Sequence, residues 1–263
     1  MTTQNVIYKM DDQSQISAKE NADIESKHFL KGYEQCSMEH VKFFAKKMEN
    51  LSLFEKHYQR FEQYFSNAND IAELGGGSGW ASYFIKKMHP NANVHLTDIA
   101  EDVVNTHQFW TTLYGCNIDG AYSAKSYDLP FEDESLDLLF CFQAAHHFGK
   151  HGATLRELHR VLRPGGIVLY LDEPVCRQWI YPAAHKRVNA RLDDDGVPED
   201  LLIYPHLLKI AQDSGFESSI VFAPHAFNRG PLQTMYYFVQ MKISFLSRLL
   251  PTCGHIVLKK KVG

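Results

Sequence analysis

Apolar runs that alternate with helical patterns predict an α/β fold. The stretch from Asp70 to Trp80 predicts a strand, a tight turn and the start of a helix, because a short apolar run gives way to glycines and then to apolar residues at helical spacing. Further strands are expected over 93–98, near 120–124 and over 136–142. Strands and helices in this alternation form a mostly parallel sheet with helices on both faces.

The same periodicity predicts the elements that flank these strands. Apolar and aromatic residues over 34–65 predict two helices with a break near 50–52, and one helix is expected over 101–114. After the core we expect an inserted helix and loop over 175–200, a helix over 204–215, a strand over 218–223, a helix over 235–250 and a last strand over 255–259.

The helix over 235–250 has two interpretations, because it is rich in Tyr, Phe, Met and Leu. Its apolar residues can pack against the sheet, and they also suit a helix that lies on a membrane surface. Its length, Lys242 and Arg248 argue against a helix that spans a bilayer. We expect the helix to dock against the sheet.

The turn after the first strand carries the first candidate chemistry. Gly75, Gly77 and Gly79 alternate directly after Glu73 and Leu74, and glycine lets a backbone turn sharply and approach a ligand. The helix that follows presents free N–H groups, which suit an anionic ligand group. Trp80 stands where a dinucleotide fingerprint needs its third glycine, and no lysine supplies a phosphate-binding loop. A tight corner without a ligand is the alternative.

The second strand ends in an acid, Asp98, about 20 residues beyond the glycine turn. A carboxylate at that place can accept hydrogen bonds from both ribose hydroxyls of a nucleoside. It can also cap the helix that begins near Glu101. The two roles can coexist, and we expect the ribose contact.

Two further motifs follow in order. Leu129-Pro130-Phe131, the acids of 132–134 and Asp137 come before the fourth strand, and an Arg-Pro-Gly-Gly turn over 163–166 comes before the fifth. With the glycine turn, these motifs resemble class I S-adenosylmethionine (SAM)-dependent methyltransferases, of the broad small-molecule group that includes the ubiquinone/menaquinone methylases. The resemblance covers Asp70 to Asp172.

The resemblance implies a Rossmann-like, doubly wound sheet of seven strands, with the last strand inserted antiparallel. It implies SAM as cofactor and S-adenosylhomocysteine as product, with the glycine turn at the methionine end and Glu73 near the amino group. An apolar Ile99 is expected against the adenine face. The expected cofactor-binding residues are Glu73, Leu74, Gly75, Gly76, Gly77, Gly79, Asp98, Ile99, Ser126, Tyr127 and Gln143.

The adenine side departs from the family pattern at one position. Lys125 stands four residues before Leu129, where the family usually has an aspartate that accepts the adenine amino group. Lysine offers no acceptor. Either Ser126 or a backbone carbonyl takes that contact, or the loop is shifted.

Candidates for the chemistry follow the fourth and fifth strands, at the edge where ligands of such sheets bind. His147 or His146 can serve as a general base, and either can instead fix a loop through hydrogen bonds. Asp172 and Glu173 end the fifth strand and can orient a substrate or cap the next helix. Trp179, in the insertion, is expected on the substrate side, and the resemblance makes Tyr33, at the end of the N-terminal arm, a candidate lid residue there.

Composition narrows the function classes. The net charge is −4, so nothing draws the whole chain to nucleic acid. Five scattered cysteines support no disulfide framework and no metal site, and the polar N-terminus carries no apolar signal core. We expect a cytoplasmic protein without a bound metal.

These inferences combine into one expected domain with four parts. A polar arm covers 1–33, a helical cap 34–65, the SAM-binding core 66–174, and a substrate-side insertion with the C-terminal strands 175–263. The expected function is transfer of the SAM methyl group to an O, N or C atom of a small molecule. The alternatives are methylation of RNA or protein, and a non-catalytic SAM-binding protein, which the departure at Lys125 favours.

Overall fold

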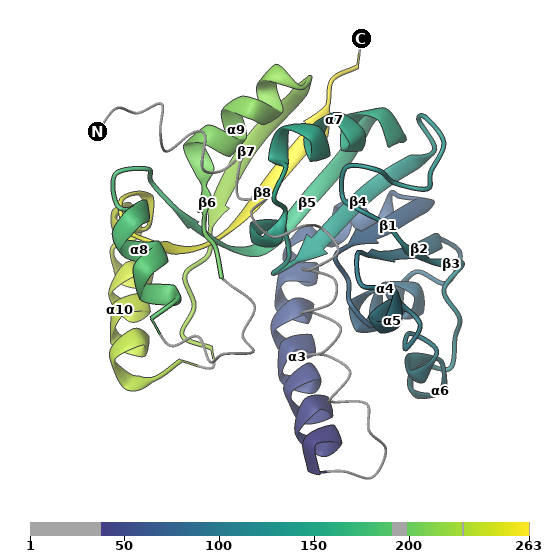
Figure 1. Ribbon diagram of the computed structural model, residues 1–263, viewed down its shortest axis with the longest axis horizontal. Coiled ribbons are helices and arrows are strands. Elements are labelled where there is room, and N and C mark those ends of the chain that lie inside the picture. Colours follow the sequence, from purple (N-terminus) through teal and green to yellow (C-terminus); the bar gives the residue numbers. More distant parts are fainter. Residues whose placement is uncertain (1–37, 191–198, 228, 263) are drawn as a thin grey trace.

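The computed structural model describes residues 38–190, 199–227 and 229–262, and a twisted sheet runs through its middle (Figure 1). The eight strands are β1 (Asp70–Leu74), β2 (Asn93–Asp98), β3 (Gly120–Ser123), β4 (Leu136–Phe142), β5 (Leu162–Cys176), β6 (Leu202–Ile203), β7 (Phe216–Phe222) and β8 (Thr252–Lys260). Short runs rich in buried apolar residues form the central strands β1, β2, β4, β5 and β8, as expected for a sheet covered on both faces.

The strand order is β3-β2-β1-β4-β5-β8-β7, and the strands from β1 to β5 pair in parallel. β8 lies antiparallel between β5 and β7, which confirms the expected inserted last strand. The two-residue strand β6 pairs with β5 off this path, so seven strands form the main path and β6 makes eight. The carboxyl ends of β1, β2, β4 and β5 meet at one edge of the sheet.

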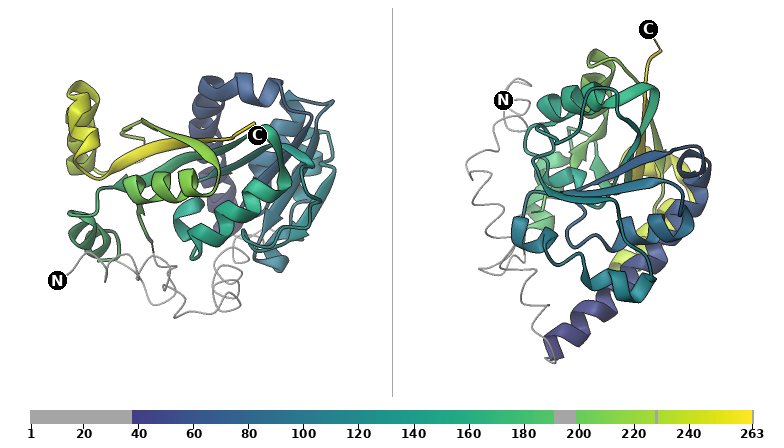
Figure 2. Two further views of the ribbon diagram at one scale, coloured as in Figure 1. Left: turned by 90° about the horizontal axis from the view of Figure 1, so that it is seen from above. Right: turned by 90° about the vertical axis from the view of Figure 1, so that its right-hand side faces the viewer.

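Helices cover both faces of the sheet (Figures 1 and 2). Neighbouring residues of one strand face opposite layers: Ile71 packs with α3 and α4, and Ala72 packs with α7 and α9. The helices are α3 (Met38–Ser66), α4 (Trp80–Met88), α5 (Glu101–Val104), α6 (Phe109–Tyr114), α7 (His151–Val161), α8 (Tyr181–Val188), α9 (Tyr204–Asp213) and α10 (Pro231–Lys242), with the 3₁₀ turns η2 (Ala145–His147) and η3 (Ser244–Arg248).

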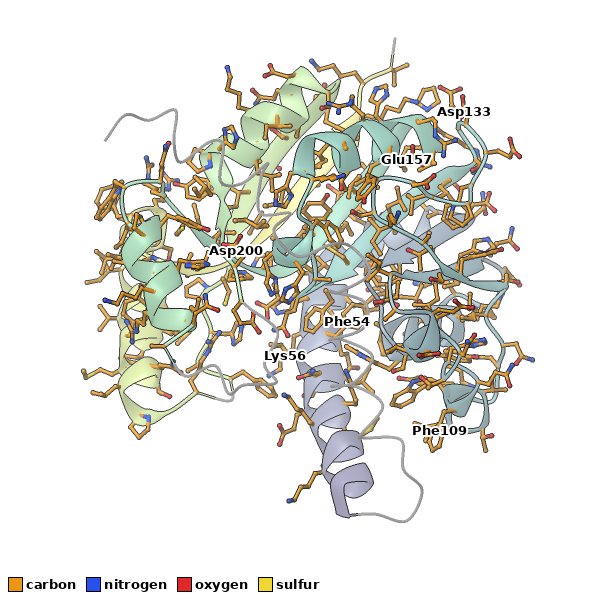
Figure 3. The ribbon with its side chains drawn as sticks, viewed as in Figure 1. Phe54, Lys56, Phe109, Asp133, Glu157 and Asp200 are labelled. Carbon is orange, nitrogen blue, oxygen red and sulfur yellow. The ribbon has the colours of Figure 1, made fainter. Side chains whose placement is uncertain are left out.

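The expected break near 50–52 is wrong, because α3 is one continuous helix. Leu53, Phe54 and Tyr58 form a buried stripe on one side of it. Phe54 meets the rings of Trp80 and Phe142 edge to face, at centroid distances of 5.5 Å and 5.4 Å (Figure 3). The polar residues near 50–52 disfavour a helix only weakly, and this packing is enough to keep α3 helical through them.

The expected single helix over 101–114 is also wrong, because it divides into α5 and α6. Between them the backbone hydrogen bonds tighten to three-residue spacing, from Thr106 N to Val103 O and from His107 N to Val104 O. Tyr83 Oη lies 3.0 Å from His107 Nδ1. This contact ties the tightened turn to α4.

The C-terminal helix differs most from expectation. Instead of one helix over 235–250, α10 ends at Lys242 and η3 follows it. Docking of this helix against the sheet is a wrong expectation, since only Gln240 of α10 is buried. Among the described residues, no helix is long and apolar enough to cross a membrane.

Candidate cofactor and acceptor site

The glycine turn between β1 and α4 has a backbone that only glycine adopts without strain. Gly75, Gly77 and Gly79 have φ angles of 61°, 56° and 84°. A Cβ atom on Gly79 would lie 2.8 Å from Leu96 Cδ2, whereas the nearest atom to a Cβ on Gly77 would be 3.9 Å away. The turn is therefore packed tightly onto β2 at its far end and leaves room at Gly77.

Asp98 holds this turn from the end of β2. Gly77 N donates to Asp98 Oδ2 at 2.7 Å, and Ala100 N donates to Asp98 Oδ1 at 2.9 Å. A carboxylate offers about four lone-pair sites, and Asp98 also accepts a backbone hydrogen bond from Ile99, so acceptor capacity remains for a ligand hydroxyl. Burial raises the pKa of Asp98, and the hydrogen bonds from the backbone oppose that rise. Sequence and structure thus bring the acid and the turn into direct contact.

Glu73 lies beneath the turn. Its carboxylate accepts hydrogen bonds from Ser82 N, at 2.9 Å, and from Ser82 Oγ. The carboxyl carbon would be 2.6 Å from a Cβ on Gly76, and only 2% of the residue is exposed. Burial raises the pKa of Glu73 to about 8. The residue therefore supports the turn and the first turn of α4 from below, and Leu74 beside it is buried in the core.

The expected adenine-side residues lie in the loops after β2 and β3. Ile99 is half-buried, and its carbonyl accepts a hydrogen bond from Ser123 Oγ at 3.3 Å. Ser126 Oγ lies 2.8 Å from Thr154 Oγ1, so its hydroxyl already has a partner. The Tyr127 ring faces cations, with Lys150 Nζ 4.8 Å from its centroid.

Strained backbone lies directly after β4 and within β5. Gln143 and Asp172 have φ angles of 51° and 56°, and Gln143 Nε2 donates to Asp172 Oδ2 at 2.7 Å. Non-glycine residues with such angles persist only where surrounding contacts hold them, and they gather at functional sites. β5 continues past Asp172 to Cys176, so the expectation that the strand ends at Asp172 is wrong, and Asp172 caps no helix.

Three histidines that the sequence analysis missed surround Asp172. His225 Nε2 donates to its Oδ1 at 3.1 Å, and His57 Nε2 lies 3.6 Å from the same oxygen. His255 Nδ1 accepts the Asp172 N–H at 3.0 Å. Burial favours the neutral acid, but the hydrogen bond from His225, with the nearby His57 and Gln143, lowers the pKa of Asp172. The cluster holds a buried carboxylate in its ionised form.

Hydrogen bonds fix the tautomers in this Asp172 cluster. Phe227 N donates to His225 Nδ1 at 3.3 Å, so the other ring nitrogen of His225 carries the hydrogen toward Asp172. His57, Asp172 and His225 place ligand atoms within 4.8 Å of one another, as a metal site would. His225 would have to give up the bond from Phe227 to coordinate an ion through Nε2. Burial lowers the pKa of His57, which favours its neutral form.

A second polar cluster joins η2 to β5. Glu173, fully buried, accepts hydrogen bonds from Ala144 N and Ala145 N at 2.9 Å and from His146 Nδ1 at 2.8 Å. His146 Nε2 lies 3.1 Å from Glu199 Oε2. Burial works against the charge on His146, but its two carboxylate partners raise its pKa to about 9. Both nitrogens of His146 therefore donate at neutral pH.

His147 differs from His146 in both exposure and charge. Its side chain is 27% exposed, and its Nε2 lies 3.9 Å from Glu199 Oε2. Burial and the neighbouring protonated His146 lower its pKa to about 4. His147 is therefore the neutral member of the pair at pH 7. His146, His147 and Glu199 also place possible metal-ligand atoms within 4.8 Å of one another. At neutral pH, however, both ring nitrogens of His146 carry protons, and a protonated nitrogen does not coordinate a metal ion.

The protonated His146 predicts a pH dependence of stability. A histidine pKa raised to about 9 in the folded state stabilises the fold fully below its unfolded pKa, and this contribution is lost as the pH rises through 9. We expect a loss on the order of 3 kcal/mol between about pH 6.5 and pH 9. Chemical denaturation across this window measures it. An equal decline in His146→Gln would contradict the assignment.

Two of the expected substrate-side residues take no part in the contacts described above. Trp179 lies in the turn before α8 and is 64% exposed. Tyr33 lies outside the described residues. The structure brings together Asp98 with the glycine turn, and Gln143 with Asp172.

Comparison with known proteins agrees with this arrangement. Residues 72–170 match the family model described as a methyltransferase domain. The chain is 35% identical over 97 residues to phthiotriol/phenolphthiotriol dimycocerosates methyltransferase 1 of Mycobacterium ulcerans, which covers 37% of this chain and 34% of that protein. It is 32% identical over 105 residues to the ubiquinone/menaquinone biosynthesis C-methyltransferase of Hahella chejuensis, which covers 39% of this chain and 42% of that protein.

A solved structure extends the similarity in fold. A SAM-dependent methyltransferase from Methanosarcina mazei superposes with a TM-score of 0.56 at 15% identity, over 78% of this chain and 99% of that one. The chain spans between about a third and a half of the length of the first curated relatives it matches. Residues 72–170 therefore match the methyltransferase domain family, on a doubly wound α/β fold that is shared with a SAM-dependent methyltransferase of known structure.

Proposed function

We propose that this protein transfers the methyl group of SAM to an O, N or C atom of a small-molecule acceptor by in-line displacement. The observation that carries the proposal is the contact between the glycine turn and Asp98, through the 2.7 Å hydrogen bond from Gly77 N. A turn with left-handed glycines that is open at Gly77, with a buried carboxylate beside it, fits a nucleoside with an attached amino acid.

The residues of the turn and the neighbouring loops would divide the cofactor between them. The turn over 75–79 would hold the methionine end, Asp98 the ribose hydroxyls, and Ile99 the adenine face. Ser126 and Tyr127 would line the adenine side, and the Ser126 hydroxyl would keep its hydrogen bond with Thr154. When bound, SAM supplies a methyl group that its positively charged sulfur has already activated.

The acceptor side is proposed beyond β4 and β5. A Cβ on Gly75 would lie 3.0 Å from Ala144 Cβ, so the loop after β4 touches the glycine turn. Gln143, held by Asp172, and Glu173, which holds η2, would fix this loop while an acceptor approaches the methyl carbon in line. Positioning of this kind, with exclusion of water, supplies most of what a methyl transfer needs.

A proton acceptor is needed only for an acceptor atom that must lose a proton. Between the two adjacent histidines, we propose His147, because both nitrogens of His146 are engaged by Glu173 and Glu199. The small-molecule class is supported by the net charge of −4 and by the relatives, whose names give phthiotriol dimycocerosates and the biosynthesis of ubiquinone and menaquinone. Lys125 favours the alternative of a SAM-binding protein without turnover.

Calorimetric titration with SAM, S-adenosylhomocysteine and NAD tests the proposal. We expect micromolar binding of SAM, weakened at least tenfold by Asp98→Ala, which is about 1.4 kcal/mol. Asp213→Asn removes an exposed acid at the end of α9 and should bind SAM like the wild type. Binding of NAD in place of SAM would refute the proposal, and turnover with candidate acceptors separates an enzyme from a binding protein.

A further inference from the structure

The outer face of α10 and η3 is apolar and exposed. Leu232 is 77% exposed, Met235 and Phe245 are each 62% exposed, and Phe238 is 52% exposed. Exposed apolar residues scattered singly are ordinary, but a contiguous group of them marks an interaction site. We call this group the α10 surface, and it comprises Leu232, Met235, Phe238, Val239, Met241, Lys242, Ile243 and Phe245.

The inner face of α10 already has its partners, so the outer face is not an undocked core face. Tyr236 Oη donates to Pro251 O at 2.6 Å, and Gln240 Nε2 donates to the same oxygen at 3.1 Å. The Tyr237 ring meets the Arg229 guanidinium at 4.5 Å. These contacts fix the helix by one side, and at 100° per residue Met235, Phe238 and Lys242 fall together on the opposite side.

The charged residues of this C-terminal segment have one sign. From residue 218 to the end, the chain has six Lys and Arg residues and no Asp or Glu. Lys242 belongs to the α10 surface, with its Nζ 5.5 Å from the centroid of Phe238, and Arg248 is exposed on η3. The apolar side chains are therefore accompanied by cations alone along this segment.

We propose that the α10 surface binds the surface of an anionic lipid bilayer. Apolar side chains inserted to the level of the headgroups and cations that meet anionic lipids are the two contributions that hold an interfacial helix on a membrane. A second copy of the chain would present the same cations to Lys242 and Arg248, so like charges would meet. Anionic headgroups complement them instead. Both Figure 1 and Figure 2 show α10 at an edge of the molecule.

Flotation of the full chain with vesicles of phosphatidylcholine, with and without phosphatidylglycerol, tests the proposal. We expect binding to the vesicles that contain phosphatidylglycerol, and binding at least tenfold weaker to pure phosphatidylcholine or in high salt. Met235→Asp and Phe238→Asp should each weaken binding at least tenfold, because each places a carboxylate where an apolar side chain meets lipid. Lys242→Glu should weaken binding to anionic vesicles only.

Leu113→Asp is the matched control. Leu113 is 60% exposed on α6, the helix that carries Phe109 and lies across the molecule from α10 (Figure 3). This variant should float with the vesicles as the wild type does. Absence of vesicle binding by the wild type, or equal loss in Leu113→Asp, would overturn the proposal. So would a dimer in gel filtration that Phe238→Asp dissociates without any binding to vesicles. None of these outcomes depends on cofactor binding.

Discussion

Replacing Glu173 with Gln is expected to lower the free energy of unfolding by about 3–5 kcal/mol, because it removes the buried partner of a buried charge. Glu173 is fully buried and accepts hydrogen bonds from three backbone N–H groups after β4, those of Ala144, Ala145 and His146, and from the His146 ring. A Gln side chain would turn its NH₂ group toward one of these donors and leave the protonated His146 without its buried counter-charge. Denaturant titration at about pH 7 measures the loss.

Glu199→Gln is the control for this prediction. Glu199 also meets His146, at 3.1 Å, but its side chain is 51% exposed. Water replaces much of its contribution, so we expect a loss of no more than about 1 kcal/mol. If Glu173→Gln cost as little as Glu199→Gln, the assignment of Glu173 as the main support of η2 would be refuted.

Replacing Gly79 with Ala is expected to lower the free energy of unfolding by about 2–4 kcal/mol, as the sum of a left-handed backbone and an overpacked contact. Gly79 has a φ of 84°, and its added Cβ would lie 2.8 Å from Leu96 Cδ2. Relief of this clash would move the turn away from Asp98. We therefore expect the calorimetric affinity for SAM to fall as well.

Gly115→Ala is the control that separates the cost of the left-handed backbone from the cost of the contact with Leu96. Gly115 ends α6 with a φ of 65°, but a Cβ there would have no atom within 4 Å. Only the cost of the left-handed backbone applies, about 1 kcal/mol, and SAM binding should not change. Equal losses in Gly79→Ala and Gly115→Ala would show that the contact with Leu96 contributes nothing.

Much of the cofactor side could be predicted from the sequence. The alternating glycines, the acid at the end of the second strand and the strand boundaries over 93–98 and 136–142 are local patterns. Each depends on a few neighbouring residues, through backbone angles that only glycine allows and apolar runs that suit a covered strand. The resemblance added the antiparallel last strand, which the structure confirms.

The acceptor side could not be read from the sequence in the same way. The cluster around Asp172 draws His57 from α3, His225 from the segment after β7 and His255 from β8, and no spacing in the chain joins these positions. The strained angles of Gln143 and Asp172 are likewise set by contacts between strands.

Short-range backbone preferences and periodicity specify the class of fold, the turn at Gly75 to Gly79 and the acid at Asp98 at the end of the second strand. Contacts between distant segments specify that Asp98 holds the turn, that α3 is one helix, that Asp172 lies among histidines and that α10 turns its Tyr236 side inward. Those outcomes depend on which side chains from distant segments pack together. Hydrophobic burial drives this packing but has no direction, so no pattern of neighbouring residues in the sequence reveals it.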